Sequence, residues 1–123
     1  MERVLIVEDD GIQAFVVARI LGKAGYEIAG PCLTLQQAFA VLEEQKIDAA
    51  VLDIGVGEGF CPVLADRLSE AGIPFGFISG YGPHVLSAQF RLRPYLAKPW
   101  SDQDLVTVLH GMVASVNRDK IAS

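Results

Sequence analysis

Hydrophobic residues along the chain follow two alternating patterns. Short runs of consecutive apolar residues predict strands buried on both faces, and apolar residues three and four positions apart predict amphipathic helices. The predicted strands cover residues 4–7, 26–30, 49–52, 75–78 and 95–97. Helical patterns follow four of them, with apolar positions at Ile12, Phe15, Val16 and Ile20; Leu35, Ala38, Phe39 and Leu42; Leu64, Ala65 and Leu68; and Leu105, Val108, Leu109 and Met112.

Capping and turn residues set the limits of these helices. Thr34 with Gln37, and Ser101 with Asp104, have the spacing of a capping box. Residues 80–94 combine glycines and prolines with only a weak apolar pattern, which predicts a short and poorly anchored helix. The last residues, 117–123, are expected to fray.

Alternating strands and helices are typical of βα units, in which right-handed crossovers produce one parallel sheet with helices on both faces. The 123 residues suffice for one core but would leave two domains marginally small. The sequence therefore predicts an α/β fold in a single domain over residues 1–123, with its core at 2–116 and a tail at 117–123.

Composition and charge reduce the number of function classes that fit this chain. Hydrophobic residues make up 51% of the chain, which is typical of a well-filled core. A net charge of −5 disfavours nucleic acid and anionic membrane surfaces as partners. No apolar run approaches the roughly 20 residues of a membrane span, and the first residues do not form a signal peptide. Two cysteines, Cys32 and Cys61, are too few for a disulfide framework or a zinc cluster, so we expect small buried side chains in a cytoplasmic protein.

Polar side chains follow four of the predicted strands at their carboxyl ends, where parallel sheets bind ligands. They are Glu8, Asp9 and Asp10 after the first strand, Asp53 after the third, Ser79 after the fourth and Lys98 after the fifth. The fold would bring these groups to one edge of the sheet although they lie far apart in the sequence.

Such a set suits phosphoryl chemistry. Crowded carboxylates repel one another, and a hard divalent cation relieves this repulsion: Mg²⁺, with Mn²⁺ as an alternative. Asp53 would be the nucleophile and form an aspartyl phosphate. Ser79 would donate a hydrogen bond to a phosphoryl oxygen, and Lys98 would neutralise phosphoryl charge.

Each residue alone has a simpler explanation. Acidic residues after a strand commonly lie in a solvated loop or at a helix N-terminus. A single aspartate there is a common turn residue or helix cap, and a lysine before a proline is usually on the surface. Only the joint placement at four strand ends favours a shared site.

The segments VLIVEDD, VLDI, FISGYG and YLAKPW, in this order, resemble the receiver domain of two-component response regulators over essentially the whole chain. The resemblance implies a flavodoxin-like, or CheY-like, sheet with strand order 2-1-3-4-5. It implies phosphorylation of Asp53 and metal binding by Glu8, Asp9, Asp53 and the backbone carbonyl of Gly55. Asp10 is a further candidate beside these acids.

The same resemblance implies a switch. Ser79 corresponds to the conserved Ser/Thr of the family and Lys98 to its invariant lysine, whose bond to Pro99 is expected to be cis. Tyr95 stands at the aromatic switch position. After phosphorylation Ser79 would move toward the phosphate and Tyr95 would pack inward, which shifts the population of two surface states.

Two segments distinguish this chain within the family. Residues 77–81 resemble the F-A-T-G-type motif of a branch of single-domain receivers often found with atypical histidine kinases. In that motif Tyr81, next to Gly80, would share or replace the switching role of Tyr95. Residues 54–59 are rich in glycine where a Met-Pro pair is common in the family, so the loop after Asp53 is expected to be loose.

The function implied is that of a stand-alone receiver, not an enzyme, which catalyses only its own phosphorylation and dephosphorylation. A sensor histidine kinase or a histidine phosphotransferase would donate the phosphoryl group. An unknown downstream protein would bind the switched surface, and the chain itself would be a monomer or weak dimer.

Two alternatives stay open. A degenerate receiver would act as a phosphorylation-independent binding module, which the glycine-rich loop after Asp53 allows. An aspartate-nucleophile phosphatase of the haloacid dehalogenase type would need a second acid at position 55, where this chain has glycine.

Overall fold

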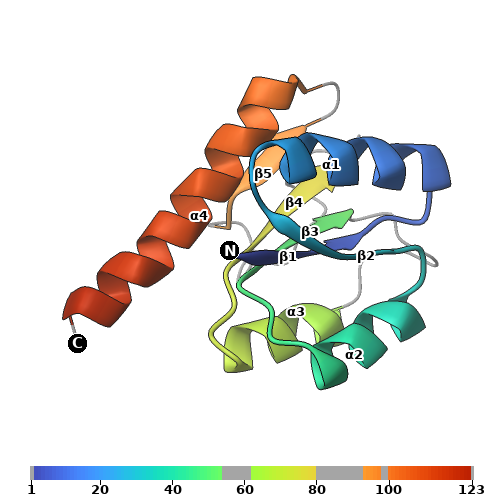
Figure 1. The fold of residues 1–123 in the computed structure, drawn as a ribbon. Helices are drawn as coiled ribbons and strands as arrows, with labels where there is room; N and C mark the ends of the chain where they lie inside the picture. The colour runs from blue at the N-terminus through green and yellow to red at the C-terminus, as the bar shows by residue number, and fades with distance from the viewer. Residues whose placement is uncertain (1, 54–61, 80–92, 98–99, 123) are drawn as a thin grey trace.

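Five parallel strands form one sheet in the computed structural model, which describes residues 2–53, 62–79, 93–97 and 100–122 (Figure 1). The strands are β1 (Arg3–Val7), β2 (Glu27–Cys32), β3 (Ala49–Asp53), β4 (Phe75–Ser79) and β5 (Tyr95–Ala97). Their order in the sheet is β2-β1-β3-β4-β5, which confirms the predicted order.

Within the described residues, four helices cover the two faces of this sheet. They are α1 (Gly11–Lys23), α2 (Leu35–Glu44), α3 (Pro62–Glu70) and α4 (Asp102–Ala122). Helices α1 and α4 lie on one face, and α2 and α3 lie on the other (Figure 1). Among the described residues, none of the helices combines the length and the apolar character needed to cross a bilayer.

The central strand β1 is apolar at consecutive positions because helices cover both of its faces. Val4 and Ile6 belong to the core cluster beneath α1 and α4. Leu5 and Val7 belong to the separate cluster beneath α2 and α3. Because successive side chains of a strand point to opposite faces, a strand covered on both sides must be apolar at every position.

The carboxyl ends of neighbouring strands lie level with one another. The register pairs Val7 with Leu52, Asp53 with Ile78, and Ser79 with Ala97. The last residues of β1, β3, β4 and β5 therefore meet at one edge of the sheet.

Both predicted caps are present, and in the first of them the Gln37 side chain accepts from the Leu33 N–H instead of the Thr34 N–H. Thr34 Oγ1 accepts a hydrogen bond from the Gln37 backbone N–H at 3.1 Å, which begins α2. Ser101 Oγ accepts from the Asp104 N–H at 3.1 Å, and Asp104 Oδ2 accepts from the Ser101 N–H at 3.2 Å. Reciprocal bonds of this kind satisfy N–H groups that the first turn of a helix leaves without a partner.

Helix α1 exposes three of the four residues from which it was predicted, and the fourth, Ile20, is partly buried against the core. Its buried residues are Ala14, Val17 and Leu21, whereas Ile12, Phe15 and Val16 are exposed. The sequence carries apolar residues on two sides of this helix, and the side with Ala14, Val17 and Leu21 faces the sheet. Periodicity alone indicates the helix but does not decide which stripe is covered.

The C-terminal region also differs from expectation. Helix α4 continues to Ala122, so most of the tail predicted to fray is helical. The weak helix predicted within residues 80–94 falls almost entirely outside the described residues.

Strand β2 contains one extra residue beside the edge that holds the polar groups. Leu5 pairs with Ala29 but Val7 pairs with Cys32, so the register shifts between these two pairs. Gly30 lies in this irregular stretch with a positive φ of 104°. A Cβ atom added there would stand 2.6 Å from the backbone nitrogen of Cys32. Glycine is therefore required here for space as well as for conformation.

We predict that Gly30→Ala destabilises the fold more than Gly25→Ala. Gly25 has a similar φ of 102° but open space around an added Cβ, so both variants share a conformational cost of roughly 1–2 kcal/mol. Only Gly30→Ala must also displace the Cys32 backbone. Urea unfolding of the two variants measures the difference, and equal losses would show that the close approach at Gly30 has no energetic consequence.

Candidate functional site

Three carboxylates converge at the edge where the strands end. Glu8 and Asp9 directly follow β1, and Asp53 is the last residue of β3, the neighbour of β1 in the sheet. One carboxylate oxygen from each lies within 4.8 Å of the others. Residues 45 positions apart in sequence thus share one small volume.

The three carboxylates differ in exposure. Glu8 is buried, with 1% of its surface exposed, Asp53 is partly buried, and Asp9 is exposed. The cluster therefore has a buried inner side and an outer side open to solvent, which suits a site that receives a group from outside.

The backbone of β2 holds Glu8 in place. The Glu8 N–H donates a hydrogen bond to the Cys32 carbonyl oxygen at 2.9 Å. Cys32 is a buried free thiol, as expected from the sequence, and its burial raises the pKa of the thiol. Its contribution to the site is made through a backbone carbonyl, which no side-chain pattern in the sequence indicates.

Asp10 has a different role from its two acidic neighbours. Its Oδ1 accepts hydrogen bonds from the N–H groups of Ile12 at 2.9 Å and Gln13 at 3.2 Å, so Asp10 is the N-cap of α1. It is not one of the three carboxylates that converge. An aspartate immediately before a helix was the available signal for this role.

The remaining site candidates are only partly described. The backbone of Ser79 pairs with that of Ala97, which brings the ends of β4 and β5 to the same level as the acids. Gly55, Gly80, Tyr81, Lys98 and Pro99 lie outside the described residues, as does Cys61.

Tyr95 lies on the α2/α3 side of the sheet. Its side chain packs against the core cluster on that side, and it pairs in register with Phe77 of β4. The Tyr95 hydroxyl is buried and has no hydrogen-bond partner among the described residues. A buried hydroxyl without a hydrogen-bond partner is less stable than one that reaches a partner or water. The inward position of the Tyr95 ring is therefore stabilised by its apolar packing and not by its hydroxyl.

The carboxylate cluster could hold a divalent metal ion. Two unit charges separated by 4 to 5 Å repel each other by roughly 3–4 kcal/mol at an effective dielectric constant of 20. Carboxylate oxygens are hard ligands suited to Mg²⁺ or Mn²⁺, which keep water or substrate oxygens in their remaining positions. The buried Glu8, the exposed Asp9 and the partly buried Asp53 fit such an ion in number, charge and chemistry.

Comparison with known protein families gives one assignment over most of the chain. Residues 4–110 match the family model of the response regulator receiver domain. Among curated proteins, the transcriptional regulatory protein PdtaR of Mycobacterium tuberculosis is 28% identical over 111 residues, covering 87% of this chain and 54% of that protein. The chemotaxis protein CheY of Thermotoga maritima is 37% identical over 57 residues, 46% of this chain and 48% of that protein. The matched regions thus span about half the length of these relatives.

Solved structures show the same fold. A CheY-like receiver domain protein from Methanospirillum hungatei superposes with a TM-score of 0.85 at 22% identity, over 97% of this chain and 98% of that one. SdrG from Sphingomonas melonis superposes with a TM-score of 0.78 at 32% identity, over 92% of this chain and 97% of that one.

We predict that Asp9→Asn weakens Mg²⁺ binding at least tenfold, because it removes one charged ligand from the cluster. Asp10→Asn is the matched control, since asparagine also caps helices and Asp10 lies outside the converging group. We expect its affinity to stay within a few-fold of the wild type. Mg²⁺ titration followed by amide NMR shifts measures both, and equal losses in the two variants would contradict the assignment of Asp9 as a ligand.

Proposed function

This chain belongs to the family of response regulator receiver domains of two-component signalling, and we propose that it accepts a phosphoryl group on Asp53 from a phosphohistidine donor. The donor would be a sensor histidine kinase or a histidine phosphotransferase. The observation that carries the proposal is the convergence of the Glu8, Asp9 and Asp53 carboxylates within 4.8 Å.

Asp53 would act as the nucleophile. Its carboxylate is only partly buried, so a donor can approach it from the solvent side. An oxygen of Asp53 attacks the phosphorus atom, the P–N bond to the donor imidazole breaks, and the imidazole nitrogen keeps the electron pair. The product is an acyl phosphate on Asp53, and water later releases inorganic phosphate from it.

Glu8 and Asp9, together with Asp53, would hold Mg²⁺, or Mn²⁺ in its place, and by family resemblance the Gly55 carbonyl completes the protein ligands. The bound ion supplies positive charge beside the transferring phosphoryl group. Because Glu8 is buried and its backbone is bonded to Cys32, the ligand set would be held in place before the donor arrives.

Ser79 and Lys98 would bind the phosphoryl oxygens. Ser79 is the last residue of β4, and Lys98 follows Ala97, the residue with which Ser79 pairs. Ser79 therefore lies at the end of β4, beside the end of β3 that holds Asp53. The Lys98 ammonium would neutralise phosphate charge, and the Ser79 hydroxyl would donate a hydrogen bond.

Phosphorylation would be read out through a surface that includes Tyr95. The Tyr95 ring is already held inward in this structure, with its hydroxyl buried. A movement of Ser79 toward the phosphate would favour one of two packings of this ring, as a shift between populated states. A downstream protein would then bind the favoured surface.

A phosphorylation-independent binding module would have no use for the acids. Three carboxylates held together, one of them buried, repel one another, and a bound cation would relieve that repulsion. Their retention favours an active receiver over a degenerate one.

We predict that the chain takes up phosphate from a phosphohistidine protein or from phosphoramidate only when Mg²⁺ is present, and that Asp53→Asn abolishes the uptake. Asp48→Asn is the control, because Asp48 lies just before β3 and accepts a hydrogen bond from the Arg3 N–H at 2.8 Å, which asparagine can also accept. Intact-mass measurement detects the modification. Phosphate that remains in Asp53→Asn, or uptake without divalent metal, would contradict the proposal.

We further predict that Lys98→Ala leaves Mg²⁺ binding largely intact but uncouples phosphorylation from Tyr95. NMR of tyrosine-labelled protein would follow the ring signal of Tyr95, assigned with Tyr95→Phe, before and after addition of the phosphodonor. The wild type should show a shift and the variant should not. A phosphorylated Lys98→Ala protein with the wild-type shift would show that this lysine does not transmit the signal.

A further inference from the structure

Strand β5, which carries Tyr95, is short and stands at the edge of the sheet. It has three residues, comes last in the strand order and pairs with β4. Main-chain pairing with β4 supports this strand on one side only, so its position also depends on side-chain contacts. The side chains that hold the start of β5 therefore also influence Tyr95.

Arg93, two residues before Tyr95, makes two side-chain contacts at the start of this strand. Its guanidinium carbon stands 4.3 Å from the centre of the Phe75 ring on β4. Its Nη2 donates a hydrogen bond of 3.0 Å to Ser69 Oγ in the last turn of α3. One cation thus joins the start of β5 to a neighbouring strand and to a helix. We call Ser69, Phe75 and Arg93 the β5 clamp.

The backbone between Arg93 and Tyr95 lies closely against β4. The Pro94 carbonyl oxygen accepts a hydrogen bond from the Phe77 N–H at 2.9 Å. A Cβ atom added to Gly76 would stand 3.2 Å from Pro94 Cβ and 3.2 Å from the Pro94 carbonyl oxygen. Contacts as close as these leave little free space, so a displacement of Arg93 also displaces the residues that follow it.

The ring that Arg93 covers is followed by two further aromatic side chains. Phe75 and Phe77 meet edge to face, with ring centres 5.7 Å apart and planes at 87°. Phe77 pairs in register with Tyr95. The two phenylalanines belong to the core cluster beneath α2 and α3, and Tyr95 packs against the same cluster. Packed aromatic rings attract one another in this geometry, so the row connects the guanidinium with Tyr95.

We propose that Arg93 is a positioning residue for Tyr95: the β5 clamp holds the start of β5 against α3 and so keeps the Tyr95 ring inward. The buried Tyr95 hydroxyl has no hydrogen-bond partner among the described residues, which favours an outward position where it reaches water. The clamp opposes this tendency. Because both act on the same ring, loss of the clamp shifts the population toward the outward position.

The clamp acts on the switch and not on the chemistry. A stacked cation and one hydrogen bond together change an equilibrium by roughly tenfold, which is within the usual range of coupling between sites. Arg93 precedes β5, whereas the carboxylates of Glu8, Asp9 and Asp53 converge at the carboxyl ends of the strands. The inference rests on the proposed function in one respect, that Tyr95 reads out phosphorylation.

Nitration of tyrosines by tetranitromethane, followed by peptide mass spectrometry, tests the clamp in the full chain without phosphodonor or Mg²⁺. Arg93→Gln should raise the nitration rate of Tyr95 at least fivefold, because an outward ring exposes its hydroxyl. Tyr26 is the internal reference, since it is buried in the core cluster on the other face of the sheet. Its rate should stay at the wild-type value, whereas a variant that only loses stability raises both rates.

Ser69→Ala tests whether the clamp acts as a unit. Ser69 is exposed, so this change removes the hydrogen bond to Arg93 and little packing. Alone it should raise the nitration rate of Tyr95 about threefold. Added to Arg93→Gln it should have no further effect, because the donor of that hydrogen bond is already absent.

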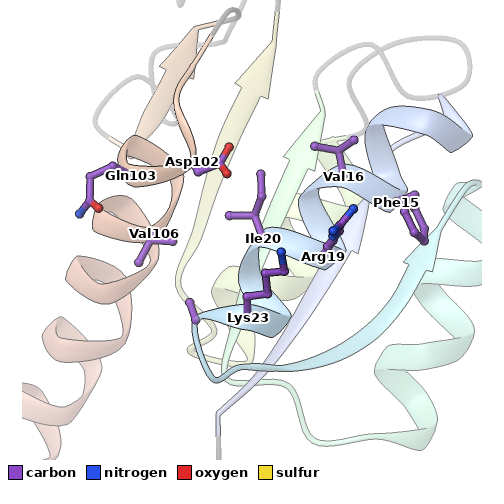
Figure 2. Close-up of a pocket in the computed structure, with 9 residues that line it drawn as sticks. Phe15, Val16, Arg19, Ile20, Lys23, Asp102, Gln103 and Val106 are labelled. Carbon is purple, nitrogen blue, oxygen red and sulfur yellow. The ribbon is translucent and has the colours of Figure 1, made fainter.

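Two exposed arginines provide matched controls for the lost charge. Arg67 lies on α3 two residues before Ser69, and residues at this spacing do not face each other on a helix. Arg19 lies on the other face of the sheet, where it lines a groove between α1 and α4 (Figure 2). Arg67→Gln and Arg19→Gln should both leave the nitration rate of Tyr95 at the wild-type value.

Four results would overturn the proposal: an unchanged Tyr95 rate in Arg93→Gln, a parallel rise at Tyr26, an equal rise in either control, or a further rise when Ser69→Ala is added to Arg93→Gln. Phosphate uptake, measured by intact mass, tests the proposed function separately, and Arg93→Gln should take up phosphate like the wild type. A wild type that takes up no phosphate contradicts the proposed function and leaves the nitration rates unchanged.

Discussion

The candidate site depends on holding three mutually repelling carboxylates, those of Glu8, Asp9 and Asp53, close together. Glu8 is almost completely buried, yet an oxygen of its carboxylate lies within 4.8 Å of one from Asp9 and one from Asp53. Like charges at this spacing repel one another, and the backbone brings them together. The order of the sheet does so, because β1 and β3 are neighbours at its centre and both end at the same edge.

A separate core cluster lies on each face of the sheet that carries the site. Tyr95 and the cluster beneath α2 and α3 lie on one side, and the groove between α1 and α4 lies on the other. Because β1 contributes alternate side chains to both clusters, neither face can be repacked without affecting the strand that carries Glu8 and Asp9. The two faces of the sheet can therefore carry two separate surfaces in a small chain.

The sequence predicted most of the fold because its local signals agree with the tertiary structure. Strand β5 was predicted with its observed ends, and both caps begin the helices that they were expected to begin. The covered side of α1 could not be predicted, because apolar residues occur on both sides of that helix and only the packing against β1 and β2 selects Ala14, Val17 and Leu21. The convergence of Glu8, Asp9 and Asp53 was expected from strand ends, whereas the bond from Glu8 to the Cys32 carbonyl involves only backbone atoms and leaves no trace in the residue types.

The run Glu8-Asp9-Asp10 shows where sequence reasoning reaches its limit. Three adjacent acids have nearly the same chemistry, so their side chains alone do not separate them, and the only local signal is the position of Asp10 directly before a helical pattern. The turn from β1 into α1 separates them by geometry: Glu8 stays in line with the buried strand, Asp9 stands at the exposed turn, and Asp10 receives two N–H groups of the first helical turn. Asp10 thereby fixes the start of α1, and with it the residue that precedes it, Asp9. The N-cap of α1 thus helps to position the carboxylate of Asp9, which converges with those of Glu8 and Asp53.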